Sequence, residues 1–118
     1  MRINGGLEAE NDKLIQLWAC SQRSYVSMKP AQCGHHYYSR RIRLLRWEIA
    51  NIIPLTYQEH TALHAGNLKL EISKGREDFL SALAHKDYKN FLLEYNLTDE
   101  DFVKIYNKKL KEQINEIR

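Results

Sequence analysis

Apolar residues near both ends of the chain recur at the spacing of an amphipathic helix. Within residues 8–20 these positions are Leu14, Ile15, Leu17 and Trp18. After Gly75 the pattern returns, and its last segment carries a stripe of Phe102, Ile105, Tyr106, Leu110, Ile114 and Ile117. We predict an N-terminal helix over about residues 8–20 and C-terminal helices over about residues 76–117. The stripe predicts core packing, with a homodimer contact through the C-terminal helices as the alternative.

The middle of the chain has the shorter apolar segments of a small sheet. Pro30 disfavours helical geometry at Lys29, so a loop is expected before it and a strand from about Ala31. Ile52-Ile53 predicts a second short strand, limited by Pro54, which has no N–H to donate to a ladder. Residues 39–50 fit a loop, a helical turn or a strand equally well.

Capping residues mark where two of the helices begin. Thr56 and Glu59 fit the S/T-x-x-E capping box, and Gly66 supplies a stop, which predicts a short helix over about residues 57–65. Thr98 is a suitable N-cap for the last helix, because three acidic residues follow it in the first turn. Two short strands, a short helix and flanking helices together predict an α+β fold, mostly helical toward the C-terminus.

Length and composition place the chain among ordinary globular proteins. Its 118 residues predict one domain over residues 1–118. No run of roughly 18 apolar residues occurs, so no membrane span is expected. Residues 1–6 lack the apolar segment of a secretion signal, and we expect a cytoplasmic protein. Cys20 and Cys33 are expected to be half-buried thiols, because a reducing compartment disfavours a disulfide.

Positive charge is concentrated in one window of the sequence. The whole chain has a formal net charge of +3, but residues 21–50 carry +5 and the remainder −2. Such a cluster is typical of binding to a phosphate backbone, and a solvated basic loop is the alternative. Arg40, Arg41 and Arg46 are the predicted nucleic-acid contacts, because a guanidinium can hold a phosphate with two parallel hydrogen bonds.

Four histidines have spacings that suit a metal site. His60 and His64 lie four residues apart, which places both rings on one face of a helix. His35 and His36 are adjacent, so in a strand they point to opposite faces and only one of them joins the helical pair. Three imidazoles favour zinc, nickel, cobalt or manganese over magnesium as the single divalent ion.

These residues resemble the HNH nucleases over about residues 31–67. The family carries an N-x-x-P-L-C-x-x-C-H run, and this chain is similar to it over Asn51-Ile52-Ile53-Pro54-Leu55-Thr56-Tyr57-Gln58-Glu59-His60, with Thr56 and Glu59 replacing the cysteines. The paired histidines and the H-x-x-x-H spacing are most similar to colicin-type nuclease domains. Cys33-Gly34-His35-His36 is closer to phage recombination-type HNH proteins.

The resemblance implies a small ββα-metal core, a site and an activity. It implies metal binding by His35, His60 and His64, general base catalysis by His36, and an Asn51 that orients the His36 ring or ties the intervening loop. Spacing alone leaves open the reverse assignment of His35 and His36. The implied activity is metal-dependent hydrolysis of phosphodiester bonds in DNA, in phage or mobile-element processing. The alternatives are an inactive DNA-binding module and a purely structural metal site.

Overall fold

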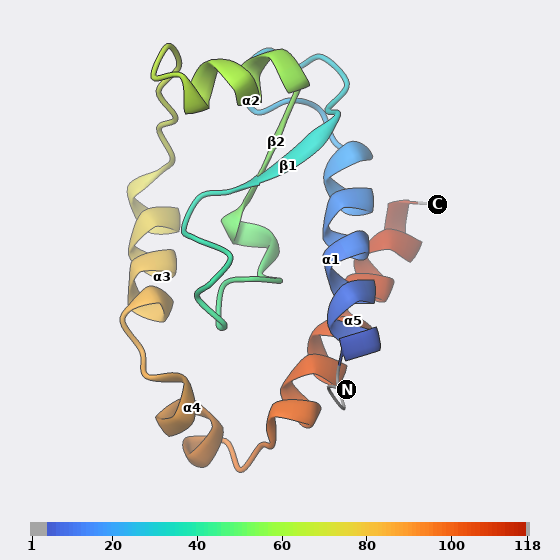
Figure 1. The fold of residues 1–118 in the computed structure, drawn as a ribbon, viewed down its shortest axis with the longest axis vertical. Coiled ribbons are helices and arrows are strands. Elements are labelled where there is room, and N and C mark those ends of the chain that lie inside the picture. Colours follow the sequence, from blue (N-terminus) through green and yellow to red (C-terminus); the bar gives the residue numbers. More distant parts are fainter. Residues whose placement is uncertain (1–4, 118) are drawn as a thin grey trace.

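Two long helices from opposite ends of the chain lie side by side and run in the same direction (Figure 1). They are α1 (Gly5–Cys20) and α5 (Asp99–Ile117), in a computed structural model that describes residues 5–117, apart from the Ile117 side chain. Between them the chain forms β1 (Cys33–His36), the 3₁₀ helix η1 (Ile49–Asn51), β2 (Ile52–Leu55), α2 (Tyr57–His64), α3 (Lys74–Ala84) and α4 (Tyr88–Glu94). The predicted α+β class is confirmed.

The sheet consists of β1 and β2 paired antiparallel, with His35 opposite Ile53 and His36 opposite Ile52. The expectation that Pro54 limits the second strand was wrong, because β2 continues through it to Leu55. Pro54 lies opposite Gly34 in a pair of residues whose backbone N and C=O groups point away from the partner strand. Its carbonyl accepts from the Tyr25 N–H at 2.9 Å on that outer side. A proline at this position removes no ladder hydrogen bond.

Helix α1 approaches β1 closely at Gly34. The Gln16 side chain donates to the Gly34 carbonyl at 3.1 Å and accepts from its N–H at 2.9 Å, so it completes the free edge of the strand. A Cβ added at Gly34 would lie 2.8 Å from both Ala19 Cβ and Ile52 Cγ2. Only glycine allows the helix to pack this near the sheet.

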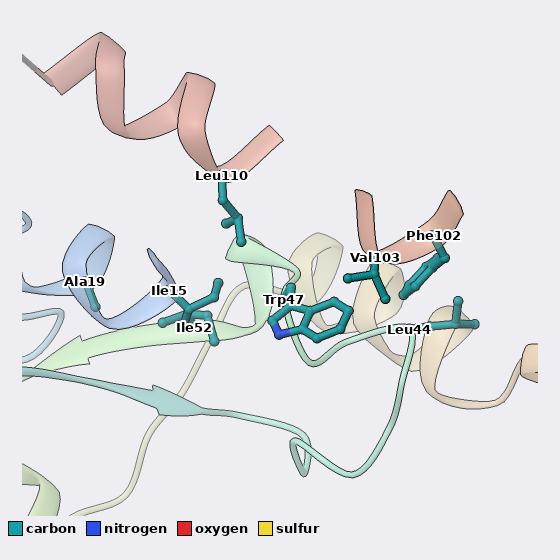
Figure 2. Packing of buried hydrophobic residues seen from close by; sticks show 8 residues of the cluster. All are labelled: Ile15, Ala19, Leu44, Trp47, Ile52, Phe102, Val103 and Leu110. Atoms are coloured by element: carbon teal, nitrogen blue, oxygen red, sulfur yellow. The ribbon is translucent and has the colours of Figure 1, made fainter. Parts of the chain in front are cut away.

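The core lies between α1, α5, β2 and the loop before η1 (Figure 2). It consists of buried apolar side chains, namely Ile15, Ala19, Leu44, Trp47, Ile52, Phe102, Val103 and Leu110. The predicted core stripe of α5 is confirmed at Phe102 and Leu110, but Ile105 is 39% exposed. In α1 the expected Leu17 is 50% exposed.

Polar residues occupy the positions between α1 and α5 that the apolar pattern did not identify. Asn11 is fully buried, donates to the Val103 carbonyl at 3.2 Å and accepts from Asn107 Nδ2 at 2.9 Å. These bonds satisfy polar groups that would otherwise be costly to bury. The helix pair therefore packs along a mixed face rather than a purely apolar stripe.

Residues 39–48 form a series of turns, the helical-turn alternative among those left open. The partly buried side chain of Arg43 holds this segment to three helices. Arg43 pairs with Glu8 of α1 at 2.7 Å and with Asp99 of α5 at 2.9 Å, and its guanidinium lies 4.8 Å from the Trp47 ring centroid. Tyr88 of α4 donates to the same Asp99 carboxylate. Arg43 thus acts as a structural residue within the basic window.

The expected N-cap of α5 and the two cysteines can also be compared with the fold. Thr98 caps α5, because its hydroxyl accepts from the Asp101 N–H at 3.0 Å. Both cysteines are free thiols, and Cys33 is partly buried as expected, but the expectation of a half-buried Cys20 was wrong, because Cys20 is exposed. Among residues 5–117, the helices are too short or too polar to cross a bilayer.

Gly34→Ala should destabilise the protein by about 1–3 kcal/mol, because the new methyl overlaps two core side chains that have no room to move. Gly75→Ala in α3 is the matched control, since a Cβ there meets nothing within 4 Å and should be neutral or slightly stabilising. Urea denaturation of both variants measures the difference. Equal stability of the two would contradict the close packing of α1 on β1.

Candidate metal centre

Three of the predicted residues converge at one place on the surface. His35 comes from β1, whereas His60 and His64 come from α2. The ring centroids are 5.3 Å apart for His35 and His60, 5.6 Å for His35 and His64, and 4.5 Å for His60 and His64. One nitrogen from each ring lies within 4.8 Å of the other two. The three imidazoles can therefore face a common ion.

Local structure explains this convergence. His35 alternates with Gly34 and His36, so it points away from α1 and toward α2. The four-residue spacing in α2 brings His60 Nε2 and His64 Nε2 to 3.0 Å. Helix α2 is short and has no buried residues, so its ends need fixing by other means.

The predicted capping box at the start of α2 is confirmed. Thr56 Oγ1 accepts from the Glu59 N–H at 3.1 Å, and Glu59 Oε1 accepts from the Thr56 N–H at 2.8 Å. Glu59 Oε1 also accepts from Ser24 Oγ at 2.6 Å, which attaches the helix start to the loop after α1. The helix ends at His64, and Gly66 follows with a φ of +79°.

The triad is favourable for neutral imidazoles, the form that binds metals. Desolvation, followed by the charges of His60 and His64, lowers the pKa of His35 to about 4. Desolvation and His64 also lower the pKa of His60. Zinc–nitrogen bonds of about 2.0–2.1 Å place tetrahedral ligands roughly 3.3 Å apart. The widest nitrogen separation must close by at most about 1.5 Å, which side-chain rotation allows.

His36 lies on the opposite side of β1 and has a different environment. Its Nε2 is 2.8 Å from the Arg46 carbonyl oxygen, which can only accept, so Nε2 carries the proton and Nδ1 the lone pair. Desolvation lowers the pKa of His36, although the bond to Arg46 acts in the other direction. The ring is therefore neutral near pH 7, with one nitrogen available to accept a proton.

Asn51 is fully buried and ties the loop, which was one of its two expected roles. Its Oδ1 accepts from the Tyr38 N–H at 2.8 Å, and its Nδ2 donates to the carbonyls of Tyr38 and Leu45, both at 3.1 Å. These bonds hold the chain on both sides of the turn segment. Asn51 thus holds the Leu45 carbonyl, and the next carbonyl along the chain, that of Arg46, contacts His36.

The three predicted phosphate-binding arginines differ in how exposed and how strongly paired their side chains are. Arg46 donates from Nε and NH2 to Asp12 at 3.0 and 2.7 Å, and its side chain is 19% exposed. Arg40 is 60% exposed and makes a longer 3.3 Å contact with the same carboxylate. Arg41 is exposed. Arg40 and Arg41 can face a ligand, whereas the Arg46 charge is already paired inside the protein.

Asp12 is the residue that sequence reasoning missed at this site. It also accepts from Trp47 Nε1 at 2.9 Å, so one carboxylate holds two consecutive residues. An acidic residue on an amphipathic helix is ordinarily expected to face solvent, and only the fold shows that it faces Arg46. His85 is exposed at the end of α3, and its Nδ1 donates to the Ser81 carbonyl at 2.8 Å. It takes no part in the triad.

No family model, curated protein or solved structure matches this chain.

Zinc should bind the wild-type protein with one-to-one stoichiometry, because three neutral imidazoles converge. His60→Ala/His64→Ala should lose at least about tenfold in affinity, since two of three ligands are removed. His85→Ala is the control and should bind like wild type. Isothermal titration calorimetry with zinc measures each affinity. Undiminished binding by the double variant would place the ion elsewhere.

Glu59→Gln should lower the melting temperature near pH 7 and have less effect as the pH falls. Burial acts to raise the pKa of Glu59, but hydrogen bonds from Ser24, Ser27 and Thr56 lower it to about 2. The carboxylate therefore contributes stability that is present above its unfolded pKa and is lost as pH falls through about 2. Thermal unfolding of both proteins across this range tests the capping interaction. A difference that stays constant with pH would contradict it.

Proposed function

We propose that this protein is a metal-dependent endonuclease of the HNH type that hydrolyses phosphodiester bonds in DNA. The supporting observation is the pairing of two features on one short strand. One nitrogen of the His35 ring lies within 4.8 Å of a nitrogen of each of the other two imidazoles, and the adjacent His36 has its Nε2 bonded to the Arg46 carbonyl. The resemblance over residues 31–67 supports the same assignment, including the order β1, β2, α2 around the site.

His35, His60 and His64 would hold the ion through neutral nitrogens. A divalent ion held by these three residues would supply stabilisation of negative charge on a phosphate oxygen and on the leaving oxygen. With three protein ligands, such an ion would keep coordination positions for substrate and water. His64 is exposed and His35 and His60 are partly exposed, so a backbone phosphate can reach the site from solvent.

His36 would act as the general base. Its Nδ1 accepts a proton from the water that attacks phosphorus, while Nε2–H keeps its bond to the Arg46 carbonyl. That carbonyl stabilises the imidazolium formed in the step, because both ring nitrogens are then donors. The lowered pKa of His36 keeps the resting ring neutral, which is the state a base requires.

Arg40 and Arg41 would contact the phosphate backbone beside the cleaved bond. Both are exposed and follow the strand that carries the base by a few residues. Phosphate contacts carry no sequence information, so binding through them is largely independent of sequence. Processing of phage or mobile-element DNA is the biological setting that the resemblance suggests.

Purified protein should nick supercoiled plasmid in the presence of a divalent ion and stop when EDTA is added. Zinc, nickel, cobalt, manganese and magnesium form the panel. His36→Ala should lower the rate by at least about 100-fold, the range expected for a lost general base, and should still bind zinc. His85→Ala should cleave like wild type. Full metal-dependent cleavage by His36→Ala would remove the base assignment, and DNA binding without cleavage by wild type would favour an inactive binding module.

A further inference from the structure

We infer that Asp12 is a positioning residue for the base, acting through the Arg46–Trp47 segment; the inference rests on the proposed nuclease function. His36 is held by a single backbone carbonyl, that of Arg46, at 2.8 Å. A peptide carbonyl can orient an imidazole only if the peptide itself is fixed. The interactions that fix the Arg46 peptide are therefore as important to the base as the hydrogen bond itself.

The Asp12 carboxylate holds the peptide from the side chains on both sides of it. Asp12 Oδ1 accepts from Arg46 Nε at 3.0 Å and from Trp47 Nε1 at 2.9 Å, and Oδ2 accepts from Arg46 NH2 at 2.7 Å. The carbonyl that reaches His36 belongs to the peptide joining these two residues. One carboxylate on α1 therefore restrains the residues on either side of this peptide.

Neighbouring residues further restrain the Arg46–Trp47 peptide that Asp12 holds. Trp47 is 1% exposed in the core, and the Arg46 guanidinium lies 5.3 Å from its ring centroid. Asn51 holds the preceding carbonyl, that of Leu45, at 3.1 Å. The segment is thus fixed on one side by Asn51 and on the other by Asp12. No regular secondary structure supplies these restraints, because residues 43–47 form turns.

Asp12 is charged in the folded protein. Partial burial acts to raise its pKa, but hydrogen bonds from Arg46 and Trp47, with the charges of Arg46 and Arg40, lower it. Charge-assisted bonds of this kind are stronger and more directional than neutral ones. Replacement by asparagine removes the charge and one acceptor from Arg46 while the side chain keeps its size.

The first experiment compares Asp12→Asn with Asp78→Asn, an exposed acid that pairs with Lys74 on α3. For metal-dependent plasmid cleavage, Asp12→Asn should lower kcat about 10- to 100-fold, as expected for a misplaced catalytic group, with KM and zinc affinity nearly unchanged. Asp12→Glu keeps the charge and should recover part of kcat. Asp78→Asn should match wild type. A kcat that falls only in proportion to the unfolded fraction would overturn the inference.

The second experiment does not depend on cleavage. Nitrogen-15 NMR of metal-free protein near pH 7 should show His36 as the Nε2–H tautomer in wild type and as a mixture of tautomers in Asp12→Asn. An unchanged tautomer would overturn the positioning role. If wild type fails to cleave yet the tautomer depends on Asp12, the nuclease proposal fails and the structural link remains.

A double-mutant cycle with Arg46→Met separates positioning from direct phosphate contact. If Asp12 and Arg46 act as one unit, the two substitutions together should lower kcat little more than either one alone. The salt dependence of DNA binding should also be the same for Arg46→Met as for wild type. Additive losses with a shallower salt slope would instead make Arg46 a phosphate contact and overturn the inference.

Discussion

The contact between α1 and β1 at Gly34 is the constraint on which the candidate site depends. Because the strand alternates, a helix packed against Gly34 also lies on the side to which His36 points, and it leaves His35 on the other side. The two adjacent histidines are thereby assigned to different surroundings. His35 meets the rings of α2, and His36 meets the Arg46 carbonyl. A bulkier residue at position 34 would disturb both sides together.

Partly or fully buried polar side chains hold the segment of turns before η1 in place of regular secondary structure. Asp12 and Asn51 reach into the segment of turns before η1, and Arg43 reaches out of that segment to Glu8 and Asp99. Each of the three makes several hydrogen bonds or ion pairs. That segment has few ladder or helix bonds of its own. The hydrogen bonds and ion pairs of these side chains restrain it instead.

The local features of the chain could be predicted from the sequence, since they depend on neighbouring residues. The capping box at Thr56 and the grouping of His60 with His64 follow from spacing within one helix. The Arg46 pairing and the role of Asp12 could not be predicted, because they join residues far apart in the chain. The exposure of Ile105 was missed for a related reason: the face of α5 that is buried depends on where α1 lies. Pro54 shows the same limit, since its tolerance in β2 depends on register.

The pairing of α1 with α5 has a consequence for biosynthesis. The proposed ligands and base all occur between His35 and His64, so the ribosome releases them well before the residues of α5. Until α5 emerges, Ile15 and Trp47 lack their partners Val103, Phe102 and Leu110, and the loop to be closed covers residues 21–98. The nascent chain therefore carries these histidines before the packing that orders them, and the proposed site forms only after α5 has been synthesised.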